Sequence, residues 1–525
     1  MQFRSAGREG ACPHPPHSSF VILHSARAPP RRHRASHHQH HTDPRQQEGA
    51  KRKGIKGYAL RRKADFHLRG GGILVYCAPM RPIATDTHDF PALRRDGKIY
   101  VDKTMFIHRL VAGNDTKLFF MSRPRRFGKS LTVSALKALF SGRRELFKGL
   151  YIDGTDWRWE KYPIIHFEFN DLTTTSLEEF EKDLADHVEN RLCAAGYAYD
   201  STKSAHYNFG RAITELAATC RAGGNERGGV VILIDEYDAP VGHSLGDIGF
   251  AEKVRDRLSA VYSQMKNRTG DIKFLFMTGV SKFTKLSVFS ALSNLVDVSQ
   301  KDEFATMFGY TEEELTANFE EHLREHARIM GKPYDVYREE MKRWYNGFRF
   351  AKGDPTTVYN PISVALTLYN KERDGFSATW ATTGRPSMLM NYLKREDMLR
   401  IDPEATTRVR EAAFDVAELH DLQPIAMLYQ SGYLTIKAYM SGLYTLGVPD
   451  EEVRQDLCML LTGVAANRSV SWASRLGDHL LCEEWDDFFD GLKALYAAMA
   501  YGPTERSVHE NAYGRCLSFL LASCG

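Results

Sequence analysis

The sequence predicts an α/β fold built on a parallel sheet, and three observations support this. Two continuous apolar runs, at 117–121 and 229–238, have the length and character of strands buried on both faces. Amphipathic patterns of helical period lie between such runs, most clearly at 177–192. A Gly-Lys-Ser triplet follows the first run directly. Strands that alternate with helices imply parallel pairing, with ligands bound at the carboxyl ends of the strands.

The first run leads into the stretch LFFMSRPRRFGKSL at 118–131. Strand, loop, Gly128-Lys129-Ser130 and helix form the phosphate-loop arrangement. Its backbone N–H groups hold phosphate oxygens, its lysine reaches the β and γ phosphates, and its serine ligates Mg²⁺. Arg123 stands where the first glycine of the usual motif would be. A bare Gly-Lys-Ser also arises by chance, as a helix start with a solvated lysine.

The second run reads GVVILIDEYD and ends in two carboxylates. Asp235 is predicted to hold Mg²⁺, directly or through water, and Glu236 to polarise an attacking water. The alternative is a strand that ends in a solvated acidic turn. Because both motifs occur in this order, the sequence favours nucleotide binding.

The remaining elements fit the same fold. Residues 89–104 are expected to carry a turn at Asp96-Gly97, a strand at 98–101 and a helix through 106–111. A strand at 164–169 precedes a capping box, Ser176 with Glu179, and an apolar helical stripe. A further strand, 272–277, ends near two hydroxyl residues that are candidates to contact the γ-phosphate or its water, namely Thr278 and Ser281.

Composition sets the wider bounds. At 525 residues the chain is long enough for two to four domains, and its 43% hydrophobic and 26% charged residues are ordinary for a globular protein. Eight cysteines include no C-x-x-C pair, so neither a zinc site nor a disulfide framework is indicated. No apolar run approaches the ~20 residues of a membrane span. We therefore expect a cytoplasmic protein without a membrane partner.

Residues 1–79 differ from the rest. They contain 15 Lys/Arg and 4 Asp/Glu, a net charge of +11, so with +4 for the whole chain the remainder carries −7. The segment is rich in Pro and His and lacks periodicity, which predicts disorder. Three interpretations stay open: a basic nucleic-acid arm or targeting peptide, a His-rich metal tract, or sequence that is not native, with translation from Met80.

From about Asp89 onward the chain resembles the bacterial AAA-ATPase-like proteins that usually end in a PD-(D/E)XK nuclease-like domain. The motifs that carry the resemblance are YVDKT (100–104), RPRRFGKS (123–130), LIDEYDAP (233–240), TGVSKF (278–283), FGYTEEEL (308–315), WYNGF (344–348), VYNP (358–361), WATTG (380–384) and SGYLTI (431–436). The resemblance implies a P-loop NTPase-type sheet followed by a mainly helical region and a nuclease-like end. The expected boundaries are 1–79, 80–305, 306–475 and 476–525.

The resemblance also implies a set of site residues. ATP is expected to contact Arg123, Arg126, Gly128, Lys129, Ser130 and Leu131, with Mg²⁺ on Ser130 and Asp235 and with Glu236, Thr278 and Ser281 in catalytic roles. The arginines of the loop, which include Arg125, either pair with phosphates or act across a subunit interface. The alternative is that they hold acidic residues of their own domain.

The C-terminal half is expected to contain helices and two apolar hairpin-like stretches within 308–454, whose aromatic residues are core packing rather than base-stacking platforms. Helices are predicted at 488–500 and 509–521. In the resembling family the second helix opens the nuclease-like domain, with Glu510 at its metal site. Because the chain stops at Gly525, the nuclease-like end is expected to be incomplete and inactive, and the apolar face around Leu517 to Leu521 is expected to dock on earlier helices or to promote association.

These observations predict an ATP-binding, Mg-dependent ATPase that couples nucleotide state to a C-terminal module. The alternatives are a nucleotide-gated binding switch with little hydrolysis and a nuclease-associated DNA-processing protein. Glu236 separates the first two, because a switch needs no water-activating carboxylate. Nucleic acid and a second copy of the chain are the candidate macromolecular partners.

Overall fold

The computed structural model divides the chain into two compact units, Met1–Cys77 and Ala78–Gly525, which are described separately. The structure describes residues 68–69, 72–73, 80–85, 88–113, 116–225, 228–282, 292, 294–371, 373, 375–379, 389, 401–413, 419–500 and 506–524. In the first unit, β1 (Leu68–Arg69) pairs with β2 (Gly72–Ile73) in antiparallel fashion. The rest of 1–79, where disorder is predicted, lies outside the described residues.

The second unit contains a five-stranded parallel sheet, in the order β4-β5-β6-β3-β7. The strands are β3 (Leu118–Ser122), β4 (Ile164–Glu168), β5 (Val230–Asp235), β6 (Ile272–Gly279) and β7 (Val296–Asp297). Every residue of β3 and β5 is buried, as expected of strands with both faces covered. The predicted fold class is therefore confirmed.

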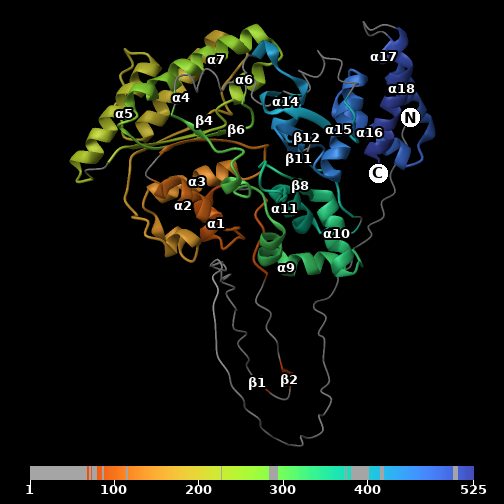
Figure 1. Ribbon diagram of the computed structural model, residues 1–525, viewed down its shortest axis with the longest axis horizontal. Helices are drawn as coiled ribbons and strands as arrows, with labels where there is room; N and C mark the ends of the chain where they lie inside the picture. The colour runs from red at the N-terminus through yellow and green to blue at the C-terminus, as the bar shows by residue number, and fades with distance from the viewer. Residues whose placement is uncertain are drawn as a thin grey trace, which may run out of the picture. The chain divides into compact units, whose positions relative to one another are not determined.

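Helices cover both faces of this sheet (Figure 1). One face carries α1 (Phe90–Arg95), α2 (Thr104–Ala112) and α3 (Lys129–Phe140). The other carries α4 (Leu177–Ala194), α5 (Ala205–Ala222), α6 (Ala239–Ser244) and α7 (Ile248–Tyr262). The short 3₁₀ turns are η1 (Arg144–Phe147), η2 (Tyr151–Gly154), η3 (Ser263–Arg268), η4 (Asp302–Phe304), η6 (Glu411–Ala413) and η7 (Leu419–Asp421).

Most local sequence predictions in this part are confirmed, and two need correction. The predicted stripe of α4 is buried, including Phe180 and Val188. Only half of the capping box is present: Ser176 Oγ accepts the Glu179 N–H (3.2 Å), while the Glu179 carboxylate accepts from nearby hydroxyls. The strand predicted at 98–101 is wrong, because only one backbone–backbone hydrogen bond, from Ile99 N–H to Pro82 O (2.9 Å), joins that segment to the neighbouring stretch.

Beyond the sheet, helices alternate with short antiparallel pairs, as predicted for this half. The helices are α9 (Glu312–Ile329), α10 (Tyr334–Tyr345), α11 (Pro361–Asn370) and α14 (Pro424–Ser431). One pair joins β8 (Asn346–Phe348) to β9 (Val358–Tyr359). A three-stranded sheet has the order β10-β12-β11, formed by β10 (Thr407–Arg410), β11 (Thr435–Met440) and β12 (Leu443–Gly447).

The described chain ends in four helices: α15 (Glu451–Ala465), α16 (Val470–Leu481), α17 (Trp485–Ala500) and α18 (Arg506–Ser523). Helix α18 packs against α15, α16 and α17. It buries Phe519 and Leu520 there, while Leu521 stays about half exposed. The apolar face of α18 thus docks on the preceding helices. Glu510 lies in α18, and its side chain is outside the described residues.

Among the described helices, none combines the length and apolar character needed to cross a bilayer. The boundaries at 305/306 and 475/476 stay predictions, because residues 78–525 form one compact unit.

Candidate functional site

The loop between β3 and α3 has the backbone of a phosphate-binding turn. It begins at Arg123, and Gly128 takes a left-handed conformation (φ 97°) immediately before α3 starts at Lys129. A Cβ at Gly128 would meet no atom within 4 Å, so the need for glycine is conformational rather than steric. Arg126 also has a positive φ (67°), which costs free energy in a non-glycine residue. The loop is thus held in a strained conformation of the kind found at functional sites.

The Lys129 side chain folds over the loop that precedes it. Only 5% of the residue is exposed, and its Nζ donates to the carbonyl oxygens of Arg123 (3.0 Å) and Pro124 (2.9 Å). Burial lowers the pKa of Lys129, while the nearby carboxylates of Asp235 and Glu236 act in the opposite direction. Because both of these acceptors are neutral carbonyls, an anion that enters the loop would be a stronger acceptor for the ammonium group.

Asp235 ends β5 and faces the start of α3. It is 2% exposed, its Oδ1 accepts the Glu236 N–H (3.0 Å), and its carboxylate is hydrogen-bonded by the Ser130 side chain. Burial raises the pKa of Asp235, and the Ser130 bond and the Lys129 charge oppose that rise. A serine hydroxyl beside a carboxylate supplies the hard oxygen ligands that Mg²⁺ takes, so the donor set fits this ion.

Glu236 adds a second carboxylate at the same edge of the sheet. Its backbone is left-handed (φ 50°), and its side chain is partly buried. Burial raises the pKa of Glu236, while the Lys129 charge opposes this. A carboxylate whose pKa lies above its usual range accepts a proton from water more readily near neutral pH, so Glu236 is chemically suited to act as a base.

Lys129, Ser130 and Glu236 line a pocket of about 560 Å³, whereas Asp235 does not line it. Such a volume lies within the range of small-molecule and cofactor sites. The phosphate-loop wall consists of Arg125, Arg126, Phe127, Gly128, Lys129, Ser130, Leu131 and Thr132, with Glu236 beside it. The pocket also has walls from residues 83–103 and 307–365, which are far from the loop in sequence.

The two hydroxyl residues predicted at the γ-phosphate lie elsewhere. Thr278 is fully buried, and its Oγ1 donates to Met121 O (2.8 Å) between β6 and β3. Ser281 is also buried, and both its hydroxyl and its N–H donate to Asp238. Neither residue lines the 560 Å³ pocket. Their catalytic assignment stays a prediction, and the contacts seen here are structural.

The loop arginines divide into two groups. Arg125 and Arg126 line the pocket. Arg123 is 3% exposed and points into the protein, where its guanidinium donates to the carbonyls of Ser299 and Phe304 and stacks on the Phe350 ring (4.2 Å). Burial lowers the pKa of Arg123 to about 10, which still leaves it charged at neutral pH. A direct contact between Arg123 and nucleotide stays a prediction, and the observed position indicates an anchor for the loop.

A second anchor was not predicted from the sequence. Phe127, at the tip of the loop, is 2% exposed and packs edge-on against Phe348 (4.8 Å) and Phe350 (5.2 Å) between the ring centroids. These partners lie at and beyond β8, more than 200 positions along the chain. Periodicity within the loop carries no signal for such a contact, because the partners belong to another part of the fold.

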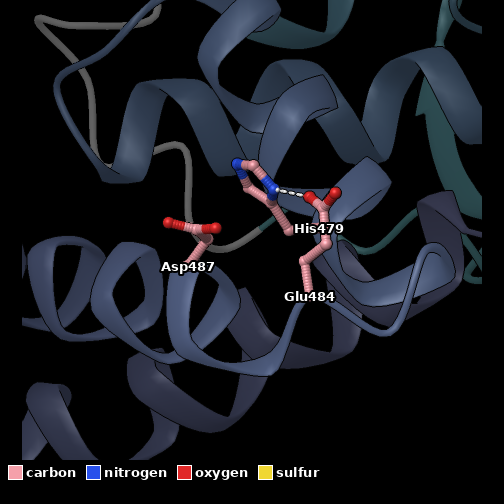
Figure 2. Close-up of side chains that lie close together, drawn as sticks. All are labelled: His479, Glu484 and Asp487. Atoms are coloured by element: carbon pink, nitrogen blue, oxygen red, sulfur yellow. Dashed lines mark hydrogen bonds and ion pairs between the residues drawn. The ribbon is translucent and has the colours of Figure 1, made fainter.

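A separate group of potential metal ligands joins α16 to α17 (Figure 2). Ligand atoms of His479, Glu484 and Asp487 all lie within 4.8 Å of one another, and His479 Nδ1 is bonded to Glu484 (2.5 Å). His479 is in the last turn of α16, and Asp487 is in the first turn of α17. A basic group at a helix C-terminus and acids at a helix N-terminus are what the helix dipoles favour, so the cluster has an electrostatic explanation without an ion.

Comparisons with known proteins agree with the geometry of the loop. Residues 82–289 match the family described as Predicted AAA-ATPase, AAA-ATPase-like. A protein of Azotobacter chroococcum mcd 1, named "Uncharacterized protein in vnfD 5'region", is 33% identical over 428 residues, which are 79% of this chain and 76% of that protein. No solved structure matches the chain.

Proposed function

The chain belongs to the predicted AAA-ATPase family, and from that premise we propose that it binds ATP with Mg²⁺ and hydrolyses it. One observation carries the proposal: buried Lys129 lies over a strained loop, opposite the Asp235–Ser130 pair, at the edge of a pocket of nucleotide size. These are the cation, the metal-binding oxygens and the space that a magnesium nucleotide requires.

Each residue has a separate role in the proposed reaction. The loop N–H groups and Lys129 bind the phosphate oxygens, and Ser130 and Asp235 would hold Mg²⁺, which would supply positive charge to offset that of the phosphates. Glu236 orients the attacking water and accepts its proton. Arg125 and Arg126 line the pocket, and their positive charge would offset charge on the phosphates. Leu131 lines the same wall and limits access of solvent.

The proposal is tested by asking whether Mg²⁺ tightens ATP binding through Asp235. In the full chain, calorimetry should give a lower Kd for ATP with Mg²⁺ than with EDTA. Asp235→Asn should remove most of that difference, because an amide oxygen is a poorer ligand for a hard cation. The matched control is Glu168→Gln, since Glu168 pairs with Asp235 in register at the end of the neighbouring strand β4. Equal Mg²⁺ dependence in Asp235→Asn and wild type would contradict the proposal.

A second candidate function is a nucleotide-gated binding switch with little turnover. The observation that favours it is the composite pocket, whose walls come from the parallel-sheet region and from residues 307–365, so a bound ligand would touch both. Nucleic acid and a second copy of the chain are the partners such a switch would control. Measured phosphate release separates the two functions, because a switch binds ATP but releases little or no phosphate.

The proposed module beyond residue 305 comprises 306–475 and 476–525. A nuclease-like character of the second segment rests on the resemblance of its sequence, and we propose that it has no cleavage activity of its own. Incubation of the full chain with Mg²⁺ and DNA tests this. Cleavage that disappears in Glu510→Ala would overturn it.

A further inference from the structure

We propose that the base and ribose of the nucleotide occupy the part of the pocket between residues 83–101 and 307–365, so that nucleoside recognition depends on residues outside the phosphate loop. The inference rests on the proposed function, because it assigns the remainder of the same ligand. It adds the walls that determine specificity, which the strand, loop and helix around Lys129 do not contain.

The first wall is an extended pair of segments. Ile99 N–H donates to Pro82 O (2.9 Å), and Arg81 donates to Lys98 O (2.9 Å), so residues 81–83 lie against residues 98–99. Ile83, Ile99 and Tyr100 line the pocket from these segments. The Tyr100 ring is fixed from behind by Phe90, edge-on at 5.0 Å between centroids. This wall therefore presents aliphatic and aromatic side chains to the pocket. Hydrogen bonds between the two segments, and the contact of Tyr100 with Phe90, hold it in place.

The second wall consists of the turn at Phe308, Gly309 and Tyr310 together with the start of α11. Tyr310 exchanges backbone hydrogen bonds with Tyr359 (3.2 and 2.8 Å), and its ring packs on Phe319 at 5.5 Å. Gly309 has a φ of +83°, and a Cβ there would lie 2.5 Å from the Val358 side chain. The backbone of the turn therefore packs closely against Val358, and this contact positions the rings of Phe308 and Tyr310.

Ile362 completes this wall from the first turn of α11. The helix start is fixed because Asn360 caps it, accepting the Ile362 N–H (3.0 Å). Ile362 is partly exposed and lines the pocket. A substitution there changes the proposed nucleoside space without changing the phosphate loop.

The chemistry of these walls suits a nucleoside rather than more phosphate. Flat aromatic rings and aliphatic groups favour the apolar faces of a base. The lysine on this side, Lys103, is bound to Glu314 (2.6 Å) and to Thr306 O (2.7 Å), so its charge is already compensated. Apart from Lys103, the lysine and arginine side chains that line the pocket belong to the phosphate-loop wall, whereas the apolar groups named above belong to the other walls, as a nucleotide requires.

The walls also belong to two different hydrophobic clusters. Tyr100 and Phe308 are part of the main core around the parallel sheet, whereas Ile99 and Phe319 belong to a second core with α9, α10 and α11. A base held between them contacts both cores. Nucleoside binding, and not phosphate binding alone, would then connect the sheet to the helical region.

The test compares ATP with inorganic triphosphate on the full chain. Ile362→Trp fills the proposed nucleoside space and should raise the Kd for Mg-ATP at least about tenfold, the order of effect expected when a pocket loses the fit of an apolar group. Its Kd for magnesium triphosphate should equal that of the wild type. Tyr369→Trp is the matched control, because it adds the same ring to an exposed position of α11. Lys129→Ala shows how much of the measured binding depends on the phosphate loop, and this variant should bind neither ATP nor triphosphate.

The outcomes separate the two proposals. If the wild type binds neither ligand through Lys129, the proposed function fails. If Ile362→Trp binds ATP as the wild type does, the nucleoside assignment is overturned while the proposed function stands. If Ile362→Trp loses both ligands, Ile362→Ala decides: a severalfold weaker ATP affinity with unchanged triphosphate affinity and an unchanged melting temperature supports the assignment, and any other result overturns it.

Discussion

Two sets of buried acids, one at the end of β5 and one at the start of α15, show how differently a fold can treat the same side chains. Asp235 and Glu236 lie beside a buried lysine, and Glu236 lines a pocket of about 560 Å³ together with that lysine. Asp450 and Glu452 are also buried, at 8% and 0% exposed. The second set does not line that pocket.

The difference lies in the partners. Glu452 accepts hydrogen bonds from Ser363 Oγ (2.7 Å), Thr379 N–H (2.9 Å) and Thr379 Oγ1 (2.7 Å). Those donors come from α11 and the segment after it, so the carboxylate joins three parts of the helical region. A carboxylate satisfied by protein donors stabilises the fold, whereas one that faces a cation across an accessible pocket can act on a ligand.

The largest effect is expected for Glu236→Gln. The amide cannot take a proton from water, so phosphate release should fall by about 10²- to 10⁴-fold while ATP affinity is kept. Steady-state phosphate release and calorimetry measure the two quantities. Full turnover in the variant would mean that another group is the base. Undetectable turnover in the wild type would favour the switch.

Lys129→Ala should weaken ATP binding by about 100-fold or more, because it removes a desolvated cation from the phosphates, a loss of about 3 kcal/mol. Lys137→Ala is the control, since it removes the same charge from an exposed position of the same helix. Calorimetric titration with Mg-ATP gives both affinities. If the two variants bind alike, Lys129 is not a phosphate ligand.

At α15, Glu452→Ala should act on stability and not on ATP. It leaves the three donors from Ser363 and Thr379 without their acceptor, at a cost of about 2–3 kcal/mol. A lower urea midpoint with an unchanged Kd for ATP is the expected result. A change in ATP affinity without loss of stability would mean that Glu452 acts on the ligand, as proposed for Asp235 and Glu236, and not on the fold.

The smallest effect is a pH dependence. Burial, and next the charge of Glu452, raise the pKa of Asp450 well above its usual range. The native state therefore binds this proton more tightly than the unfolded state, and stability falls as pH rises from about 4 through the raised native pKa. The nearby Lys437 and the backbone N–H of Val453 limit the rise.

Asp450→Asn tests this, because the amide oxygen can still accept the Val453 N–H (3.0 Å) that Asp450 Oδ1 accepts at the start of α15. The variant should lose that part of the pH dependence and should be more stable than the wild type at pH 8. Urea unfolding between pH 5 and pH 8 measures both. Parallel curves for the two proteins would show that Asp450 does not titrate in this window.

The sequence predicted the parts of the fold that local patterns specify. The apolar runs gave β3 and β5, and the Gly-Lys-Ser triplet located the start of α3, because burial and helix initiation leave signals within a few residues. The strand expected at 98–101 was wrong, since an apolar segment beside a single extended neighbour has the same pattern as a strand.

The site was predictable on one side only. Lys129, Asp235 and Glu236 stand in short motifs, whereas Tyr310 and Ile362 reach the pocket through tertiary structure. The positions of Thr278 and Arg123 show the limit of motif reasoning. Thr278 lies at the end of β6 and Arg123 directly follows β3, but hydrogen bonds to Met121 O and Ser299 O direct their side chains into the protein.

The bonds from Lys129 to the Arg123 and Pro124 carbonyls have a thermodynamic consequence. The lysine is already desolvated and the loop already ordered, so phosphate entry exchanges one set of acceptors for another and freezes little additional chain. The heat-capacity change of binding should then come from the apolar walls around Tyr310 and Ile362, because burial of apolar surface is its main source. The phosphate end would set how strongly the nucleotide is held, and the nucleoside end would set how that strength changes with temperature.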